Sequence, residues 1–127
     1  MKNLLISILC LLILIVPWLI YDRYAGTVIT YSAELLEKEV IPAIVDNEWE
    51  KAEKKYNIIV DKWKRFEKIS EYFLDTAAIN EADQMIHKTK YHIMMRAPGD
   101  ASADSSELKH MLTYLHENEM ISPGNIL

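Results

Sequence analysis

The chain has 127 residues and a formal net charge of −5 at pH 7, which allows one domain beyond an N-terminal segment. An acidic chain without a basic stripe repels phosphate backbones, so we expect no nucleic-acid partner. With three glycines and four prolines among many Glu, Lys, Ala, Leu and Met residues, the composition favours helices and disfavours long flexible linkers.

An uncharged, strongly apolar run follows Lys2. A helix rises about 1.5 Å per residue, so roughly 19 uncharged residues span close to the ~30 Å of a hydrocarbon core. Trp18 and Tyr21 lie where aromatic side chains settle at a headgroup boundary. We therefore expect residues 1–21 to form a transmembrane anchor that contacts the lipid bilayer, and residues 22–127 to form a helical bundle domain.

Two other interpretations of the run are weaker. A buried core helix would not lack charge on every face for five turns. A cleaved signal peptide fits the basic start and Pro17, but it needs small residues three and one before the cut. Arg23 stands two residues before Ala25, and Tyr24 stands two residues before Gly26. The sequence therefore favours an uncleaved anchor. The run also holds the single cysteine, Cys10, which excludes an internal disulfide.

The orientation of the anchor follows from its flanks. Lys2 precedes the run, whereas Arg23 and Lys38 follow it, so the count of basic residues alone does not favour export. The very short N-terminal tail and the layout typical of a signal sequence place the N-terminus inside. We expect a single-pass protein of the cell membrane with most of the chain outside the cytoplasm.

A stripe of apolar residues continues beyond the run and predicts that the anchor helix extends outward. Pro42 removes a backbone donor and disfavours helical geometry at Ile41, so we expect a kink or a break there. The residues of this stripe are Ile29, Ala33, Leu36, Val40 and Ala43 or Ile44.

The next helix is expected to start at Asn47, because Asn47-Glu-Trp-Glu50 has the spacing of a capping box. A strict three-four spacing of apolar residues follows and indicates a helix packed lengthwise against its neighbours. We assign its two tryptophans to the core and not to a ligand groove, since aromatic residues dominate core burial. The stripe comprises Trp49, Ala52, Tyr56, Ile59, Trp63, Phe66, Ser70 and Phe73.

Two more helices are expected after a break near Leu74-Asp75-Thr76. Pro98-Gly99 and the run from Asp100 to Ser105 have the composition of a turn and loop, and Asp104-Ser-Ser-Glu107 forms a second capping box. Ser122-Pro-Gly-Asn125 would end the last helix. The two stripes are Ile79, Ala82, Ile86, Thr89 and Ile93, and then Leu108, Met111, Leu112 and Leu115.

No segment alternates with period two, so we predict an all-α fold. The N-terminal transmembrane helix would continue into an antiparallel bundle of three to four helices. We expect its structural core to contain Trp49, Ala52, Tyr56, Ile59, Trp63, Phe66, Phe73, Ile79, Ile86, Ile93, Leu108, Leu112 and Leu115.

Four histidines are the only hint of metal chemistry. Asp83 and His87 share one helix face, and Glu107-Leu-Lys-His110 has the Glu-x-x-His spacing of di-iron bundles. Such a site needs a second motif, but Gln84-Met-Ile-His87 lacks the carboxylate. We therefore read these residues as solvated polar faces, and we expect no metal and no cofactor. The other two histidines are His92 and His116.

Catalytic signatures are also missing from the sequence. There is no Gly-x-Ser-x-Gly elbow, and the three glycines stand too far apart to form a phosphate-binding loop. Helix capping accounts for the serines near residue 105. We expect that the protein is not an enzyme and has no catalytic residues.

Several segments of the chain, taken together and in their order along the sequence, resemble a known family. They are the short anchor, Asn47-Glu-Trp-Glu-Lys-Ala52, Trp63, Phe73-Leu-Asp75 and the ending from Leu115-His-Glu-Asn-Glu to Ser-Pro-Gly-Asn-Ile-Leu127. Together they resemble the domain-of-unknown-function family four-three-six-three, which comprises small single-pass helical proteins of clostridia-like Firmicutes. The resemblance covers nearly the whole chain.

The resemblance implies a membrane-anchored helical domain and supplies no activity. It also implies an integral membrane protein as partner, since genes for multi-pass membrane proteins neighbour those of the family. Where the family has a histidine after the Asp of the Phe73-Leu-Asp75 step, this chain has Thr76, so a role of that histidine is not carried over.

Two functions remain open at this point. The first is a non-enzymatic extracytoplasmic interaction or adaptor module. The alternative is an envelope protein that binds a small ligand or a metal in the bundle interior or on the faces of His87 and His110. Homo-oligomerisation is left open by the sequence.

Overall fold

The computed structural model describes residues 1–119, and all of its regular structure is helical. No strand occurs among these residues, so the predicted all-α fold is confirmed. The predicted ending at Ser122–Asn125 lies outside the described residues. The helices are α1 (Lys2–Leu35), η1 (Leu36–Val40), α2 (Ile41–Val45), α3 (Trp49–Ser70), α4 (Thr76–Met94), α5 (Pro98–Tyr114) and η2 (Leu115–Glu119), where η1 and η2 are π-helical.

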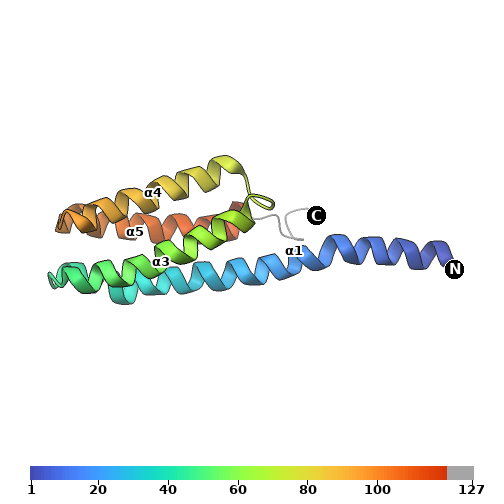
Figure 1. The fold of residues 1–127 in the computed structure, drawn as a ribbon, viewed down its shortest axis with the longest axis horizontal. Helices are drawn as coiled ribbons and strands as arrows, with labels where there is room; N and C mark the ends of the chain where they lie inside the picture. Colours follow the sequence, from blue (N-terminus) through green and yellow to red (C-terminus); the bar gives the residue numbers. More distant parts are fainter. Residues whose placement is uncertain (120–127) are drawn as a thin grey trace.

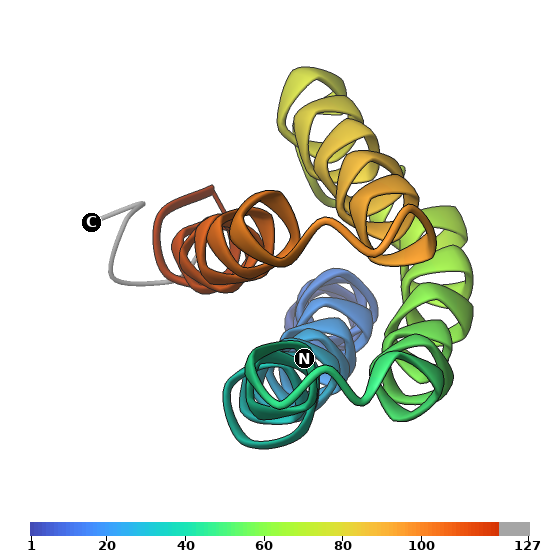
Figure 2. The ribbon, with the colours of Figure 1, turned by 90° about the vertical axis from the view of Figure 1, so that its left-hand side faces the viewer.

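The long helices form an antiparallel up-down-up-down bundle (Figure 1). Viewed along its axis, each helix contacts two neighbours: α1 lies against α3 and α5, and α4 lies against the same two helices (Figure 2). The bundle has two ends. We call the end where α3 passes into α4 the Tyr21 end, and the end with the turns after α2 and α4 the Asn47 end.

The first part of α1 extends beyond the Tyr21 end without any neighbouring helix (Figure 1). In length and composition the helix Lys2–Val45 is able to cross a membrane, and only 6% of its most apolar window is buried. The core helix of a soluble protein would be mostly buried, so that interpretation does not fit. A membrane anchor and a signal sequence both fit the apolar helix.

Of the kink or break expected at Pro42, no break occurs, because a π-helical segment carries the helix past the proline. The backbone N–H of Ile41 donates to the carbonyl oxygen of Leu36, five residues earlier, and Pro42 occupies the first turn of α2. A proline is tolerated there because its missing N–H has no partner in a first turn, while the wider turn before it accommodates its ring. Pro17 likewise lies inside α1. The helix is therefore continuous from the apolar run to Val45.

The capping box predicted at Asn47 is wrong. Asn47 adopts a left-handed conformation with φ 58°, its N–H donates to the carbonyl of Ile44, and the N–H of Glu48 donates to that of Ala43. This pair of bonds is a Schellman motif, which ends α2. Asn47 therefore terminates the preceding helix and does not cap α3. The N-cap of α3 is Glu48, one residue later than expected, and it forms no side-chain cap bond.

The second predicted capping box is also wrong. The same motif ends α4, with Arg96 at φ 53° and the N–H of Ala97 bonded to the carbonyl of His92. It leads directly into Pro98, which is well suited to a first helical position, so α5 starts two turns earlier than expected. The expected loop from Asp100 to Ser105 is helical, and Asp104 is buried inside α5.

The break predicted near residue 75 is present. Asp75 is the N-cap of α4, and its carboxylate accepts a hydrogen bond of 3.4 Å from the N–H of Ala77. Among the residues assigned to the core, Trp49 and Phe73 are partly buried and pack against it. The others are buried: Ala52, Tyr56, Ile59, Trp63, Phe66, Ile79, Ile86, Ile93, Leu108, Leu112 and Leu115.

Trp63 provides a direct test of this packing. Its ring is 4% exposed, and its Nε1–H donates to Oδ1 of Asp83 at 3.0 Å. We expect Trp63→Ala to lower the free energy of unfolding by about 3–5 kcal/mol, because it leaves a cavity between helices. Trp63→Phe, which keeps a ring but removes the donor, should cost less. Thermal denaturation of the full chain in detergent micelles measures both, and an unchanged melting temperature of Trp63→Ala would contradict the packing.

Candidate functional site

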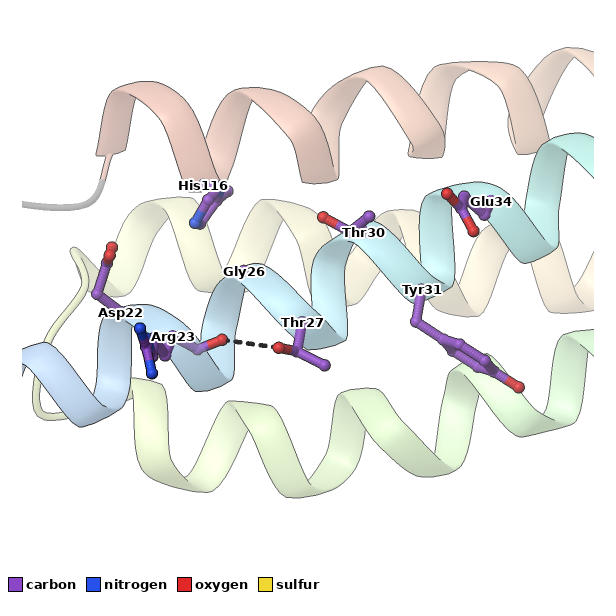
Figure 3. A pocket seen from close by; sticks show the side chains of 8 residues that line it. All are labelled: Asp22, Arg23, Gly26, Thr27, Thr30, Tyr31, Glu34 and His116. Atoms are coloured by element: carbon purple, nitrogen blue, oxygen red, sulfur yellow. Dashed lines mark hydrogen bonds between the residues drawn. The ribbon is translucent and has the colours of Figure 1, made fainter.

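A groove on the surface of α1, near the Tyr21 end, is the first place where polar side chains gather (Figure 3). His116 of η2 points at Gly26 of α1, and a Cβ added to Gly26 would lie 3.1 Å from Nε2 of His116. The glycine therefore permits the imidazole to lie close to the α1 backbone. The groove is lined by Asp22, Arg23, Gly26, Thr27, Thr30, Tyr31, Glu34 and His116.

The chemistry of this groove is mixed. It carries two carboxylates, one guanidinium and one imidazole along a surface that is open to solvent. The hydroxyl of Thr27 donates to the carbonyl of Arg23 at 2.9 Å, and Lys62 lies over the ring of Tyr31 at 4.6 Å. Two of the lining side chains are thus engaged within the protein. No group of three His, Cys, Asp or Glu side chains with metal-binding geometry occurs within residues 1–119.

A second polar cluster lies inside the bundle, between α4 and α5, and is built around Asp104. The side chain of Asp104 is 7% exposed, and its carboxylate is paired with Nδ1 of His92 and lies 3.7 Å from Nζ of Lys88. A buried carboxylate requires such partners, because an unpaired one would be strongly destabilising. The cluster thus acts as a polar connection between the two helices.

Neutral hydrogen bonds continue this cluster toward α3. The hydroxyl of Tyr56 donates to the carbonyl of Ile86, and the hydroxyl of Thr89 donates to that of Met85 at 2.7 Å. Burial raises the pKa of Tyr56 well above its usual value, so its phenol is a neutral donor at physiological pH. The bond of Tyr56 joins α3 to α4, whereas the bond of Thr89 lies within α4, and both hold side chains of the core in place.

Nucleophilic catalysis would require a hydroxyl within hydrogen-bond distance of a base. Ser105 is fully buried beside Asp104, but its Oγ forms no hydrogen bond to any described residue. The pair of His92 and Asp104 therefore has no partnered nucleophile in this part of the chain. The geometry is that of a hydrogen-bonded pair that connects α4 and α5.

The histidines singled out in the sequence lie on exposed surfaces. Nδ1 of His87 lies 2.8 Å from the carbonyl oxygen and 3.6 Å from the carboxylate of Asp83. The same carboxylate accepts the hydrogen bond from Trp63, so it is already used in packing. Glu107 and His110 are exposed on α5. The structure does not bring the two sequence motifs together into a single ligand set.

The pairing of His92 with Asp104 is not predicted from the sequence above. A signal was present, since Asp104 and Ser105 stand four and three residues before Leu108 on the apolar stripe of α5. A polar residue on a buried stripe needs a partner from a facing helix. The assumed loop at Asp100–Ser105 concealed this position.

The comparisons with known proteins identify a family. The model described as Domain of unknown function (DUF4363) matches residues 27–126. The chain belongs to this family. The match begins in the last third of α1, after the apolar run, and it confirms the resemblance found in the sequence. The chain has no significant match among curated proteins or solved structures.

We expect Asp104→Ala to lower the free energy of unfolding by about 1–3 kcal/mol, because it leaves the partly buried His92 without its acceptor. Glu107→Ala is the matched control, since Glu107 is exposed on the same helix. Its effect should stay within about 0.5 kcal/mol. If Asp104 and Glu107 formed a capping box, both substitutions would lower the free energy of unfolding. A similar decrease for the two variants in urea denaturation would therefore contradict the placement of Asp104 inside α5.

Glu67 gives a pH-dependent prediction. Burial, followed by the nearby carboxylate of Asp83, raises the pKa of Glu67 in the folded state. The folded chain then binds more protons than the unfolded chain just above pH 4.5, so stability falls as pH rises through that window. Glu67→Gln removes this loss. We expect a gain of a few tenths of a kcal/mol at pH 7, because solvent screens a partly exposed group.

The measurement is thermal denaturation of both chains at pH 7 and at a pH below 4. The difference in melting temperature should be present at pH 7 and vanish at the acidic pH. Glu53→Gln, at an exposed position of the same helix, serves as control and should change neither value appreciably. A lower melting temperature of Glu67→Gln at pH 7 would be opposite in sign to this expectation.

Proposed function

We propose that this DUF4363 protein is a single-pass membrane protein whose uncleaved N-terminal helix holds a helical bundle at the outer surface of the cytoplasmic membrane. The bundle is a non-enzymatic interaction or adaptor module, and its partner is an integral membrane protein. The family description supplies no activity, so the proposal rests on the architecture of the chain.

The observation that carries the proposal is the double role of Tyr21. This residue directly follows the apolar run, and it is also part of the bundle core with 3% exposure. Its hydroxyl donates to Oγ of Ser70 at 2.8 Å, and its ring stacks on Phe73 with a centroid distance of 4.1 Å. Cleavage near Ala25 or Gly26 would remove these contacts. A removable signal peptide would not be expected to supply a core residue.

The absence of enzymatic activity is supported by the use of the polar groups. The buried carboxylate of Asp104 is paired with His92 and lies near Lys88, and Asp83 holds Trp63. These groups stabilise the packing of the helices. Chemistry at a substrate would require groups that are free to change partners.

The alternative, an envelope protein that binds a small ligand or a metal, would depend on the groove of Figure 3 with His116, Asp22 and Glu34. Thermal melts of the full chain with divalent metals and with chelator test it. A shift of the melting temperature that is lost in His116→Ala would favour this function. Equal melting temperatures under all conditions would remove it.

We expect cysteine labelling to place the bundle outside the cell. The variant Cys10→Ser with Met95→Cys has one cysteine, at a position that is 61% exposed at the Asn47 end. A membrane-impermeant maleimide should label it in intact cells, and the intact mass should retain residues 2–21. Wild-type Cys10, within the apolar run, should resist the reagent. Labelling only after lysis would reverse the orientation, and a mass without the apolar run would mean cleavage.

The partner is tested by chemical crosslinking in native membranes. The surface carries several exposed lysines, among them Lys54, Lys64 and Lys68, which an amine-reactive crosslinker can reach. We expect a discrete adduct with one integral membrane protein, identified by mass spectrometry and lost when the partner gene is deleted. Recovery of this chain alone at every expression level would contradict the adaptor function.

A further inference from the structure

The turn between α3 and α4, residues 71–75, lies beside the point where α1 leaves the bundle (Figure 1). Tyr72, in the middle of this turn, is 85% exposed, and Ile69 in the last turn of α3 is 42% exposed. A tyrosine with so little contact contributes almost nothing to the packing of the bundle. An exposed tyrosine ring with a polar hydroxyl is suited to a membrane–water interface.

The contacts of Tyr21 fix the position of this turn along the axis of α1. Its hydrogen bond to Ser70 and its stacking on Phe73 hold the residues on both sides of Tyr72. Tyr21 directly follows the apolar run, and Trp18, one turn earlier, is half-buried. If the run crosses a bilayer, both aromatic residues lie at the headgroup boundary. The turn then lies at the same depth.

We propose that the α3–α4 turn inserts Tyr72 and Ile69 into the headgroup region of the bilayer that α1 crosses. The bundle thereby has a second contact with lipid, beside its anchor. The inference rests on the proposed function, because it requires α1 to span the membrane. It adds a lipid-binding surface, formed by a segment that is about 50 residues away from the anchor in the sequence.

Charge does not explain this contact. Lys68 and Arg23 are exposed near the turn, as are Glu71 and Asp75, and Asp22 is half-buried beside Arg23. Two positive and three negative groups give no net attraction to anionic lipid. The contact therefore depends on burial of the tyrosine ring and the isoleucine side chain, and it should be the same on zwitterionic and anionic bilayers.

The opposite end of the bundle supplies the control position. From Tyr21 to Val45 the helix rises about 36 Å, so the Asn47 end cannot reach the same headgroups when the bundle stands on its anchor. Met95 at that end is 61% exposed and is comparable to Tyr72 in being accessible to a label. Reporters at the two positions differ in their distance from the membrane.

The experiment uses the full chain in vesicles of phosphatidylcholine with doxyl-labelled lipid. A nitrobenzoxadiazole fluorophore is attached to single cysteines in the Cys10→Ser background, at Tyr72→Cys, Ile69→Cys or Met95→Cys. We expect headgroup-proximal doxyl to quench positions 72 and 69 at least twofold more than position 95, with a blue-shifted emission. Adding phosphatidylglycerol should not change the ratio. Equal quenching at all three positions would overturn the proposal.

A fluorophore on wild-type Cys10 separates this inference from the proposed function. Quenching at Cys10 by doxyl groups deep in the acyl chains means that α1 spans the bilayer. If Cys10 is quenched and positions 72 and 69 are not, the lipid contact of the turn is wrong and the anchor stands. If Cys10 is not quenched, the anchor itself is refuted and the turn contact with it. Circular dichroism of each variant verifies that the helices have formed, and Ile69→Cys decides the question if Tyr72→Cys disturbs the turn.

Discussion

A single helix with two different surroundings is the constraint on which the structure depends. From Leu4 to Pro17 the side chains of α1 are exposed, whereas from Tyr21 onward one face of the same helix is core. The change occurs within one turn, without a linker. The contacts of Tyr21 with Ser70 and Phe73 lie directly at this change and hold the α3–α4 turn against it. The bundle is therefore connected to the apolar segment by a continuous helix and not by a flexible chain.

The segment that follows α1, from η1 to the turn after α2, shows how the chain reverses into the other helices of the bundle. The π-helical segment lets the helix pass Pro42, and a Schellman motif at Asn47 then reverses the chain into α3. The same motif at Arg96 reverses α4 into α5. Both turns of the Asn47 end are thus made by backbone hydrogen bonds in a few residues. The apolar stripes predicted the four long helices well, because burial fixes their spacing and short turns leave them little freedom.

The errors of sequence reasoning have a common physical origin. Asparagine is favourable both as the N-cap of a helix and as the left-handed residue that follows a helix. Asn47 directly follows α2 and takes the left-handed conformation there, so it cannot also cap α3. Likewise, the polar run from Asp100 to Ser105 has the composition of a loop, but Pro98 starts a helix and Ala101 and Leu108 are buried on one face of it. The pairing of His92 with Asp104 depends on the rotation of two facing helices, which local composition does not determine. Residues on one helix could be placed from the sequence, and contacts between helices could not.

The arrangement also determines which surfaces a partner can reach. If α1 is fixed in a bilayer and the α3–α4 turn lies at its surface, as we propose, the long sides of the bundle stand upright and the Asn47 end points away. That end exposes Val45, Met94 and Met95, about 36 Å from the headgroups. Lipid cannot cover these side chains in this orientation, because the rigid helix sets their height. A partner that meets them must extend well above the membrane, whereas a partner buried in the bilayer would meet the apolar run of α1. In the proposed orientation, the length of one helix therefore divides the possible partner contacts of the chain into two separate zones.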